Sequence, residues 1–236
     1  YGMDDEIWAT EKTDPARHQQ LKRMKQEDLA RADQYREKAI EVYKQIIRDH
    51  PTFAKLDEVL FYLGFNYKEK GDSESAQKIF TMLIKKYPSS PFIPDTLLAF
   101  GEFFFEINEV ESALRFYEKA ARYTDSKVYG FALYKMGWCY YNLAQWDKAL
   151  EKFIQVIRYS ETSAGQSDAN RITLLREAQN DLVRTYSHVG SGAKAIGFFK
   201  RVVPNGYVPL ARRLAEIYAT DGKGVESNDL YRQLIK

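Results

Sequence analysis

The sequence predicts an all-α array of antiparallel helix pairs, and three observations support this fold class. The motif Leu63-Gly64-x-x-Tyr67 returns as Phe100-Gly101-x-x-Phe104 and as Met136-Gly137-x-x-Tyr140, at intervals of 37 and 36 residues. Downstream of each motif, a small residue is followed four positions later by an aromatic residue. Turn-forming residues separate the periodic segments. A fixed period of this length is typical of repeat architectures, in which each repeat contacts only its neighbours.

The pair formed by a small and an aromatic residue predicts the second helix of each unit. Positions four apart lie on one face of a helix, so the small residue admits a neighbouring helix and the ring fills the space beside it. The small residues are Ala39, Ala76, Ala113, Ala149, Ala195 and Ser227. The aromatic partners are Tyr43, Phe80, Tyr117, Phe153, Phe199 and Tyr231.

The first helix of each unit is predicted from the apolar spacing that precedes the small residue. Leu60, Leu63 and Tyr67 recur with the helical period. A glycine in the middle of a helix costs about 1 kcal/mol relative to alanine. Its recurrence at Gly64, Gly101 and Gly137 therefore predicts close contact with the partner helix.

Turns and helix ends are predicted from glycine and proline. Between the helices of a pair lie Lys70-Gly71-Asp72, Ile107-Asn108-Glu109, Ala144–Asp147, Gly190-Ser191-Gly192 and Asp221–Gly224. Pro51, Pro88 and Pro204 are expected to end second helices, because proline cannot continue a helix.

Two segments depart from the repeat. Residues 15–50 are charged and nearly free of glycine, which predicts one long helix that could act as the polar cap of an array. Residues 160–170 are small and polar, and they lengthen one interval to 46 residues. We interpret them as a loop or a lengthened turn.

The pattern resembles the tetratricopeptide repeat, a helix–turn–helix unit of about 34 residues. The resemblance covers about residues 20–236, and it weakens in the fourth unit, where Val183 replaces the glycine. It implies a right-handed superhelical solenoid of antiparallel helix pairs. The expected division is a poorly structured segment 1–19, a helical cap or partial repeat 20–56, three repeats 57–159, a polar insertion 160–172 and two degenerate repeats 173–236.

Composition excludes several classes of function. The 35 basic and 33 acidic side chains give a net charge of +2, which disfavours nucleic-acid binding. We find no apolar run long enough to span a membrane. The acidic start Tyr1–Trp8 is no secretory signal, and without an initiating methionine we expect a processed or shortened chain. The single cysteine, Cys139, is expected to be a buried apolar side chain.

Enzyme motifs are missing from the sequence, which predicts neither catalysis nor a cofactor. Gly190–Lys194 superficially resembles a phosphate loop, but no strand leads into it and a turn is expected. His18, His50 and His188 lie far apart along the chain, so no metal site is predicted. The acidic residues are interpreted as solvated helix faces.

The resemblance implies that the first helices line a concave groove that binds a protein or peptide. The run Gly137–Tyr141 is apolar around much of its helix, so a second face must be buried against a neighbouring helix or a partner. Both alternatives stay open for each aromatic residue. The hypothetical groove residues are Phe61, Phe65, Phe105, Tyr134, Trp138, Tyr141, Arg184 and Arg212.

The expected function is a non-enzymatic scaffold for protein–protein interaction. The groove would suit a peptide with apolar anchors and an acidic end, because Arg184 and Arg212 are cationic. The Lys/Asn clamp by which some relatives hold a carboxylate is not supported, because Phe61, Phe65 and Ala99 occupy its positions. The alternative is a self-assembling structural subunit, in which repeat faces or the N-terminal helix pack on other copies.

A second resemblance concerns location. The junction Tyr87-Pro88-Ser89-Ser90-Pro91 resembles repeat junctions of bacterial envelope proteins, namely the Tol-Pal-associated coordinator and the lipoprotein of the outer-membrane barrel assembly machine. It implies a periplasmic or outer-membrane-associated protein within a cell-envelope complex, and a cytoplasmic protein is the alternative.

Overall fold

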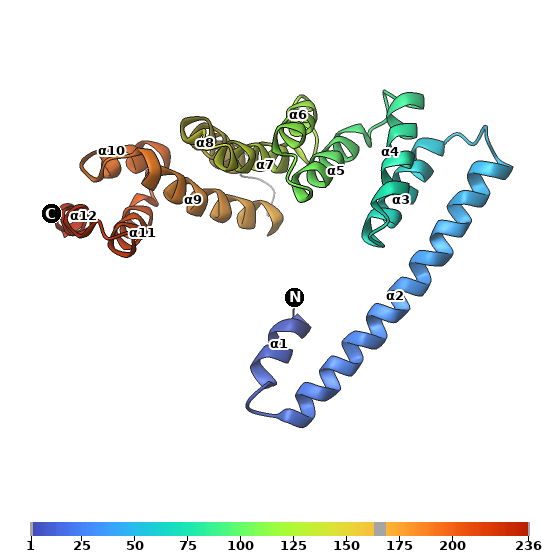
Figure 1. The fold of residues 1–236 in the computed structure, drawn as a ribbon, viewed down its shortest axis with the longest axis horizontal. Coiled ribbons are helices and arrows are strands. Elements are labelled where there is room, and N and C mark those ends of the chain that lie inside the picture. Colours follow the sequence, from blue (N-terminus) through green and yellow to red (C-terminus); the bar gives the residue numbers. More distant parts are fainter. Residues whose placement is uncertain (1, 163–168, 236) are drawn as a thin grey trace. The chain divides into compact units, whose positions relative to one another are not determined.

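The structure of the chain is a computed structural model that describes residues 2–162 and 169–235. Every regular element in these residues is an α-helix, so the all-α fold class is confirmed (Figure 1). The chain divides into two compact units, Tyr1–Ile93 and Pro94–Lys236. Each unit is described by itself.

The first unit contains four helices. They are α1 (Gly2–Thr10), α2 (Pro15–Asp49), α3 (Leu56–Glu69) and α4 (Ser73–Lys86). Helix α1 folds back against the start of α2, and α3 packs against both α2 and α4 (Figure 1). The predicted single helix over residues 15–50 is confirmed by α2.

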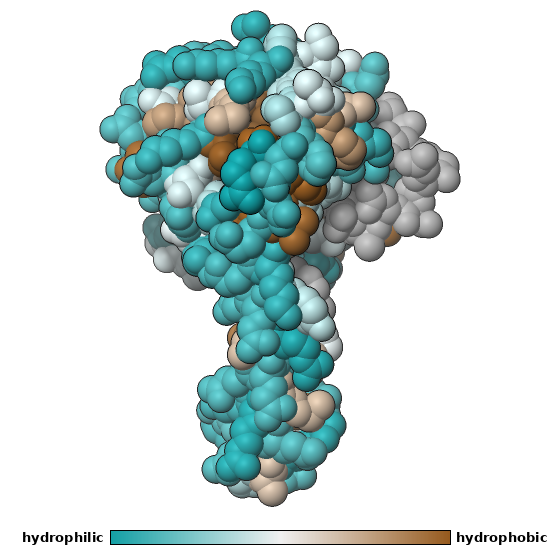
Figure 2. Space-filling view, turned by 90° about the vertical axis from the view of Figure 1, so that its right-hand side faces the viewer, coloured by the Kyte–Doolittle hydropathy of each residue, from teal (hydrophilic) through white to brown (hydrophobic). Residues whose placement is uncertain are grey.

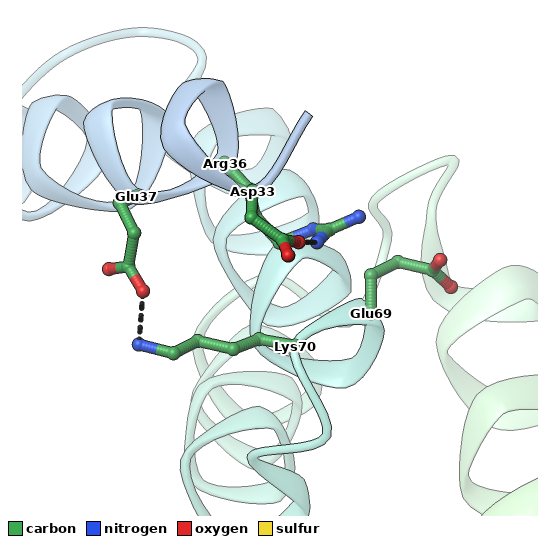
Figure 3. A pocket seen from close by; sticks show the side chains of 5 residues that line it. All are labelled: Asp33, Arg36, Glu37, Glu69 and Lys70. Carbon is green, nitrogen blue, oxygen red and sulfur yellow. Dashed lines mark hydrogen bonds and ion pairs between the residues drawn. The ribbon is translucent and has the colours of Figure 1, made fainter. Parts of the chain in front are cut away.

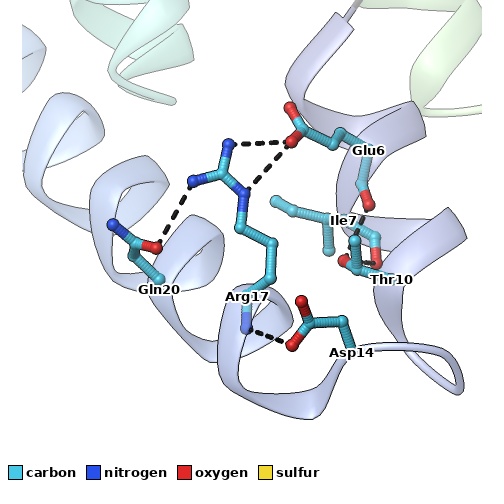
Figure 4. A network of polar contacts seen from close by, with 6 residues as sticks. All are labelled: Glu6, Ile7, Thr10, Asp14, Arg17 and Gln20. Carbon is cyan, nitrogen blue, oxygen red and sulfur yellow. Dashed lines mark hydrogen bonds and ion pairs between the residues drawn. The ribbon is translucent and has the colours of Figure 1, made fainter.

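The corner between α1 and α2 differs from the expectation that residues 1–19 are poorly structured. Asp14 caps α2 by accepting a hydrogen bond from the Arg17 backbone N–H at 3.0 Å, and Pro15 fits the first turn (Figure 4). Arg17 also pairs with Glu6 of α1 at 2.8 Å. The cap and the ion pair hold α1 and the start of α2 together at this corner.

Helix α2 is mostly solvated. Its buried side chains are Leu21 and Ile40, one beside α1 and one towards α3. Figure 2 shows the stem formed by α1 and α2 with a mainly hydrophilic surface and few hydrophobic side chains. The stem therefore contributes little apolar core of its own.

The second unit contains four helix pairs. Its helices are α5 (Ile93–Glu106), α6 (Val110–Ala120), α7 (Tyr129–Asn142), α8 (Trp146–Thr162), α9 (Ala169–Val189), α10 (Gly192–Val202), α11 (Tyr207–Thr220) and α12 (Gly224–Ile235). Within this unit α9 packs against α7, α8 and α11, so first helices of successive pairs touch one another. This arrangement is an α-solenoid of helix pairs, as predicted.

The core lies where the two helices of each pair meet. Five of the six small residues are buried, and the aromatic side chains Phe80, Tyr117, Phe153 and Phe199 are at most 3% exposed. Ala39 is only half-buried and is the exception. The small residue and the ring therefore form the contact layer of each complete pair.

The recurring glycines are explained by these rings. A Cβ added at Gly64, Gly101 or Gly137 would lie 2.5, 2.3 or 2.6 Å from the ring of Phe80, Tyr117 or Phe153, respectively. Carbon atoms at van der Waals contact lie about 3.5–4.0 Å apart, so a side chain at these positions would clash. The predicted close contact between paired helices is confirmed.

The turn after a first helix is made by the backbone. Ala144 N–H donates to Tyr141 C=O at 3.0 Å and Gln145 N–H to Tyr140 C=O at 2.9 Å, which is the Schellman arrangement. In four of the pairs, one residue of this turn has a positive φ. These residues are Gly71, Asn108, Ala144 and Gly222. At Ala144, with φ 53°, the left-handed backbone is adopted at a steric cost.

Helix ends agree with the proline signals. Helices α2, α4 and α10 each end two residues before Pro51, Pro88 and Pro204. The predicted polar insertion at 160–172 falls partly outside the described residues, since α8 runs to Thr162 and α9 begins at Ala169.

Candidate functional site

Helix α7 carries a second apolar face beside the one that packs on α8. Leu133 and Gly137 are buried in the pair with α8. Tyr134, Trp138 and Tyr141 are half-buried and pack against the edge of the core. Because α7 also packs on α9, each of these three side chains meets a polar residue of α9.

Tyr134 is joined to a buried carboxylate. Its hydroxyl donates a hydrogen bond of 2.7 Å to Asp181 Oδ2, and Asp181 is 8% exposed. Burial raises the pKa of Asp181, while the hydrogen bond from Tyr134 and the charge of Arg184 oppose this rise. Burial also raises the pKa of Tyr134, so its hydroxyl keeps its proton and acts as the donor.

Trp138 lies under a guanidinium group. The Arg184 guanidinium carbon is 5.9 Å from the Trp138 ring centroid, within the range of a cation–π contact. Arg184 also approaches Asp181 at 3.9 Å and remains 51% exposed. The exposed cation is thus held over an aromatic ring, with a buried carboxylate on its inner side.

Tyr141 belongs to a cluster of three rings with Trp146 and His188. Tyr141 Oη lies 3.0 Å from His188 Nε2. The His188 ring stacks on Trp146 with centroids 4.3 Å apart and 10° between the planes. Tyr141 meets Trp146 edge to face at 4.9 Å. The start of α8 and the end of α9 are thereby tied to α7.

The hydroxyl contacts of Tyr134 and Tyr141 with α9 have the same spacing along the sequence. Tyr134–Asp181 and Tyr141–His188 are each separated by 47 residues, and the members of each helix are two turns apart. Sequence reasoning missed Asp181, His188 and Trp146. The contacts of Asp181 and His188 with α7 join different repeats, and the pattern within one repeat carries no signal for them.

Two neighbouring arginines on α11 have different surroundings. Arg213 donates a 2.9 Å hydrogen bond to Asn180 Oδ1 on α9. Arg212 is exposed, and no partner is found for it among the described residues. Arg184 and Arg212 are therefore the solvated cations among the predicted residues, although no contact between them is present in the described structure.

The other predicted residues lie elsewhere. Phe61 and Phe65 belong to the first unit, where their ring centroids are 6.4 Å apart and Phe65 is 44% exposed. Phe61 also stacks on Phe92 at 4.7 Å. Phe105 packs against the core of the second unit. Within the second unit, Trp138 contacts Tyr141 and Arg184 directly, and Tyr134 is linked to Arg184 through Asp181.

A cleft of the first unit is lined entirely by charged side chains (Figure 3). Its volume is about 340 Å³, and its residues are Asp33, Arg36, Glu37, Glu69 and Lys70. Lys70 pairs with Glu37 at 2.5 Å, and Arg36 pairs with Asp33. Ion pairs between exposed side chains are screened by solvent and contribute little to stability, so the cleft is a surface ion-pair network.

Reactive groups are scarce in the described residues. Burial raises the pKa of Cys139 to about 12, so its thiol stays protonated and unreactive at neutral pH. Groups of three or more His, Cys, Asp or Glu side chains that could hold a metal ion are not found in residues 2–162 and 169–235. Within the same ranges, no helix is long and apolar enough to cross a membrane.

Comparisons with known proteins agree with this architecture. A model of the tetratricopeptide repeat family matches residues 58–90 and 131–163, which correspond to the pairs α3–α4 and α7–α8. No protein with curated annotation matches the chain significantly.

Solved structures show the same fold at low sequence identity. BtubC from P. vanneervenii is 13% identical, with a TM-score of 0.58 over 87% of this chain and 89% of that chain. A tetratricopeptide repeat protein from Parabacteroides merdae is 16% identical, with a TM-score of 0.53 over 99% and 78%. The C-terminal part of a repeat-containing protein from Cytophaga hutchinsonii is 17% identical, with a TM-score of 0.56 over 89% and 76%.

Proposed function

The chain is a tetratricopeptide repeat protein, and on this premise we propose that it is a non-enzymatic scaffold that binds a partner peptide. The proposed binding surface is the exposed edge of α7 and α9, and we extend it to Arg212 of α11, the helix that packs on α9. The observation that carries this proposal is Arg184, an exposed cation held 5.9 Å above the Trp138 ring. A rigid aromatic beside a held guanidinium is the pairing of residue types enriched at interface hot spots.

The surface is organised before a partner arrives. Asp181 limits the freedom of Arg184, and Tyr134 holds Asp181 in turn. Side chains already fixed lose less conformational entropy on binding, so a larger part of the contact energy is retained as affinity. Trp138 and Tyr141 are half-buried, so part of each ring is accessible to a partner while the rest packs on the protein.

The chemistry favours a peptide with an apolar anchor and an acidic end. The anchor would lie against the ring edges of Trp138 and Tyr141, and a carboxylate would pair with Arg184 in a bidentate manner. Arg212 would add attraction for a second acidic group. Phe61 and Phe65 supply a separate apolar contact on the first unit, where Phe65 is 44% exposed.

The location within a cell-envelope complex belongs to the same proposal. It rests on the resemblance of the junction Tyr87–Pro91 to those of envelope repeat proteins. In the structure this junction follows α4, and the Ser90 hydroxyl donates a 2.7 Å hydrogen bond to Asp57 Oδ2 on α3. The serine thus fixes the turn to its own helix pair.

The test is a selection of displayed random peptides on the full chain. We expect enrichment of peptides that contain an aromatic or leucine residue next to Asp or Glu. A selected peptide should then bind about tenfold or more weakly to Trp138→Ala, the loss expected of a hot-spot residue. Arg184→Glu should weaken acidic peptides more than neutral variants of the same peptides.

The matched control is Trp8→Ala. Trp8 is 80% exposed in the first unit, so its removal alters composition in the same way without touching the surface. The proposal is wrong if Trp138→Ala and Tyr134→Ala keep the helical circular dichroism signal and bind the selected peptides as tightly as the wild-type chain does.

A further inference from the structure

Helix α2 resembles the second helix of a pair but lacks a first helix beside its register residues. In complete pairs the residue three positions after the small one faces the first helix: Phe116 stacks on Phe100 and Phe104 at 5.1 and 5.3 Å. The equivalent residue of α2 is Val42, which is 53% exposed. A helix-docking position on α2 is therefore open.

The open position is part of a longer stripe. Residues spaced four, three, four, three and four apart, the seam spacing of a coiled coil, are Met24, Asp28, Arg31, Tyr35, Lys38 and Val42. The apolar members Met24, Tyr35 and Val42 are 42%, 64% and 53% exposed. The charged members are also exposed, and none forms an ion pair with another described helix.

The neighbouring helices leave this stripe uncovered. The polar contacts of α1 reach α2 at Arg17, His18 and Lys25. Glu37 and Tyr43 contact α3, through Lys70 and Tyr62. None of these contact residues belongs to the stripe. Within the stripe, Lys38 Nζ lies 5.8 Å from the Tyr35 ring centroid, a contact that the Asp28 and Arg31 side chains of a second helix would replace.

We propose that the stripe binds α2 of a second copy of this chain, with the two helices antiparallel. In the register that we assign, Met24 lies opposite Val42 of the second copy, Asp28 opposite its Lys38 and Arg31 opposite its Tyr35. Each contact occurs twice because the arrangement is two-fold symmetric. The stripe thus forms two apolar layers, two ion pairs and two cation–π contacts.

Charge pairing favours the antiparallel over the parallel orientation of the two α2 helices. In a parallel pair each residue meets its own copy, so Asp28, Arg31 and Lys38 would all face like charges. Shifting the antiparallel pair by one heptad towards the N-terminus would use Leu21, which is 2% exposed beneath α1. The opposite shift would place Met24 against Asp49. The assigned register alone pairs every charged residue within the free part of the stripe.

The charged residues of the stripe determine how stable the dimer is expected to be. Charged residues in a coiled-coil seam lower stability while they specify register and orientation. The overlap spans 19 residues, or roughly 28 Å of helix. A dimer that dissociates on dilution and weakens at high salt is expected, because its ion pairs are solvent-exposed. This contact is independent of the peptide surface on α7 and α9.

The experiment measures the mass of the full chain by sedimentation equilibrium at several concentrations. The wild-type chain should approach the dimer mass as concentration rises. Lys38→Asp should raise the dimer Kd about tenfold or more, since Asp28 would then face another carboxylate in place of an ammonium group. Asp28→Lys should do the same for the opposite reason. The control Lys22→Asp has the same charge change outside the stripe and should dimerise as the wild type does.

Charge exchange then tests the register. An equimolar mixture of the Lys38→Asp and Asp28→Lys chains should form a heterodimer, and the double variant Asp28→Lys with Lys38→Asp should recover the homodimer. In the shifted register that pairs Asp28 with Arg31, Lys38→Asp would have no such effect. A chain with both Met24→Cys and Val42→Cys should form a disulfide-linked dimer, whereas Met24→Cys alone should not.

Three results would overturn the proposal. These are a monomer at every concentration, a dimer unaffected by Lys38→Asp, and a mixture of the two charge variants that stays monomeric. Circular dichroism of each variant shows whether the helices persist, so that loss of the dimer is distinguished from loss of the fold.

Discussion

The same pair of small and aromatic residues has different surroundings in α2 and in α8. In α8, Ala149 and Phe153 are fully buried because α7 covers them. In α2, Ala39 and Tyr43 are half-buried, since α1 lies against the start of that helix and no described helix takes the place of α7. The register therefore marks a docking position, and burial follows only where a first helix occupies it.

The largest expected effect comes from enlarging the small residue in each of the two helices. Ala149→Leu adds three carbon atoms at a fully buried contact and should lower the free energy of unfolding by about 3 kcal/mol. Ala39→Leu, its counterpart in α2, should change that free energy by less than about 0.5 kcal/mol. Urea unfolding followed by circular dichroism measures both. Equal losses would show that α2 is covered as tightly as α8.

A second substitution tests how closely α7 packs against α8. Gly137→Ala places a Cβ 2.6 Å from the Phe153 ring and should cost about 1–2 kcal/mol, because the ring must shift. Gly224→Ala is the control, since an added Cβ there has no neighbour within 4 Å. Tryptophan fluorescence during urea unfolding suits this test, because Trp138 and Trp146 lie in the same unit. Tolerance of Gly137→Ala would mean that the pair is looser than described.

A third substitution tests whether the buried hydroxyl of Tyr117 has a hydrogen-bond partner. The Tyr117 hydroxyl is buried without a hydrogen-bond partner in the described structure, and three equivalent positions hold Phe80, Phe153 and Phe199. Tyr117→Phe removes the unpaired group and should raise the free energy of unfolding by about 1 kcal/mol. A loss of stability in thermal unfolding would instead show that the hydroxyl is bonded.

The smallest expected effect concerns Asp181 and pH. Burial holds the folded-state pKa of Asp181 above the value of about 3.9 in unfolded chains. The folded state then binds the proton more tightly, so the contribution of Asp181 is fully present below that pH and is lost as pH rises through the folded pKa.

Asp181→Asn keeps an oxygen that can accept from Tyr134 but removes this titration. The stability of the variant relative to the wild type should therefore rise between about pH 4 and neutral pH, and then level off. Chemical unfolding at a series of pH values measures it. Parallel stability curves over this range would contradict the assignment.

Much of the fold followed from the sequence because its causes are local and steric. Gly64, Gly101 and Gly137 predicted close helix contacts, and each faces a ring of its own pair. The helix at Gly2–Thr10 was not predicted, because its order depends on pairing with α2, which a charged composition does not reveal.

The candidate site was only partly predictable. Trp138 stood out because it made α7 apolar on a second face. Its partner Arg184 was among the predicted residues, but Asp181 and His188 were not. Their contacts depend on how α9 packs along α7, which the pattern within one repeat does not predict. Whether a partner covers the surface stays a prediction.

The two hydroxyl contacts of α7 also have a mechanical meaning. Tyr134–Asp181 and Tyr141–His188 act as two struts, set two turns apart along the same pair of helices. Sliding α9 along α7 would stretch both struts at once, whereas a small rotation about the helix axes would load them unequally. The two contacts together therefore fix the position of α9 along α7.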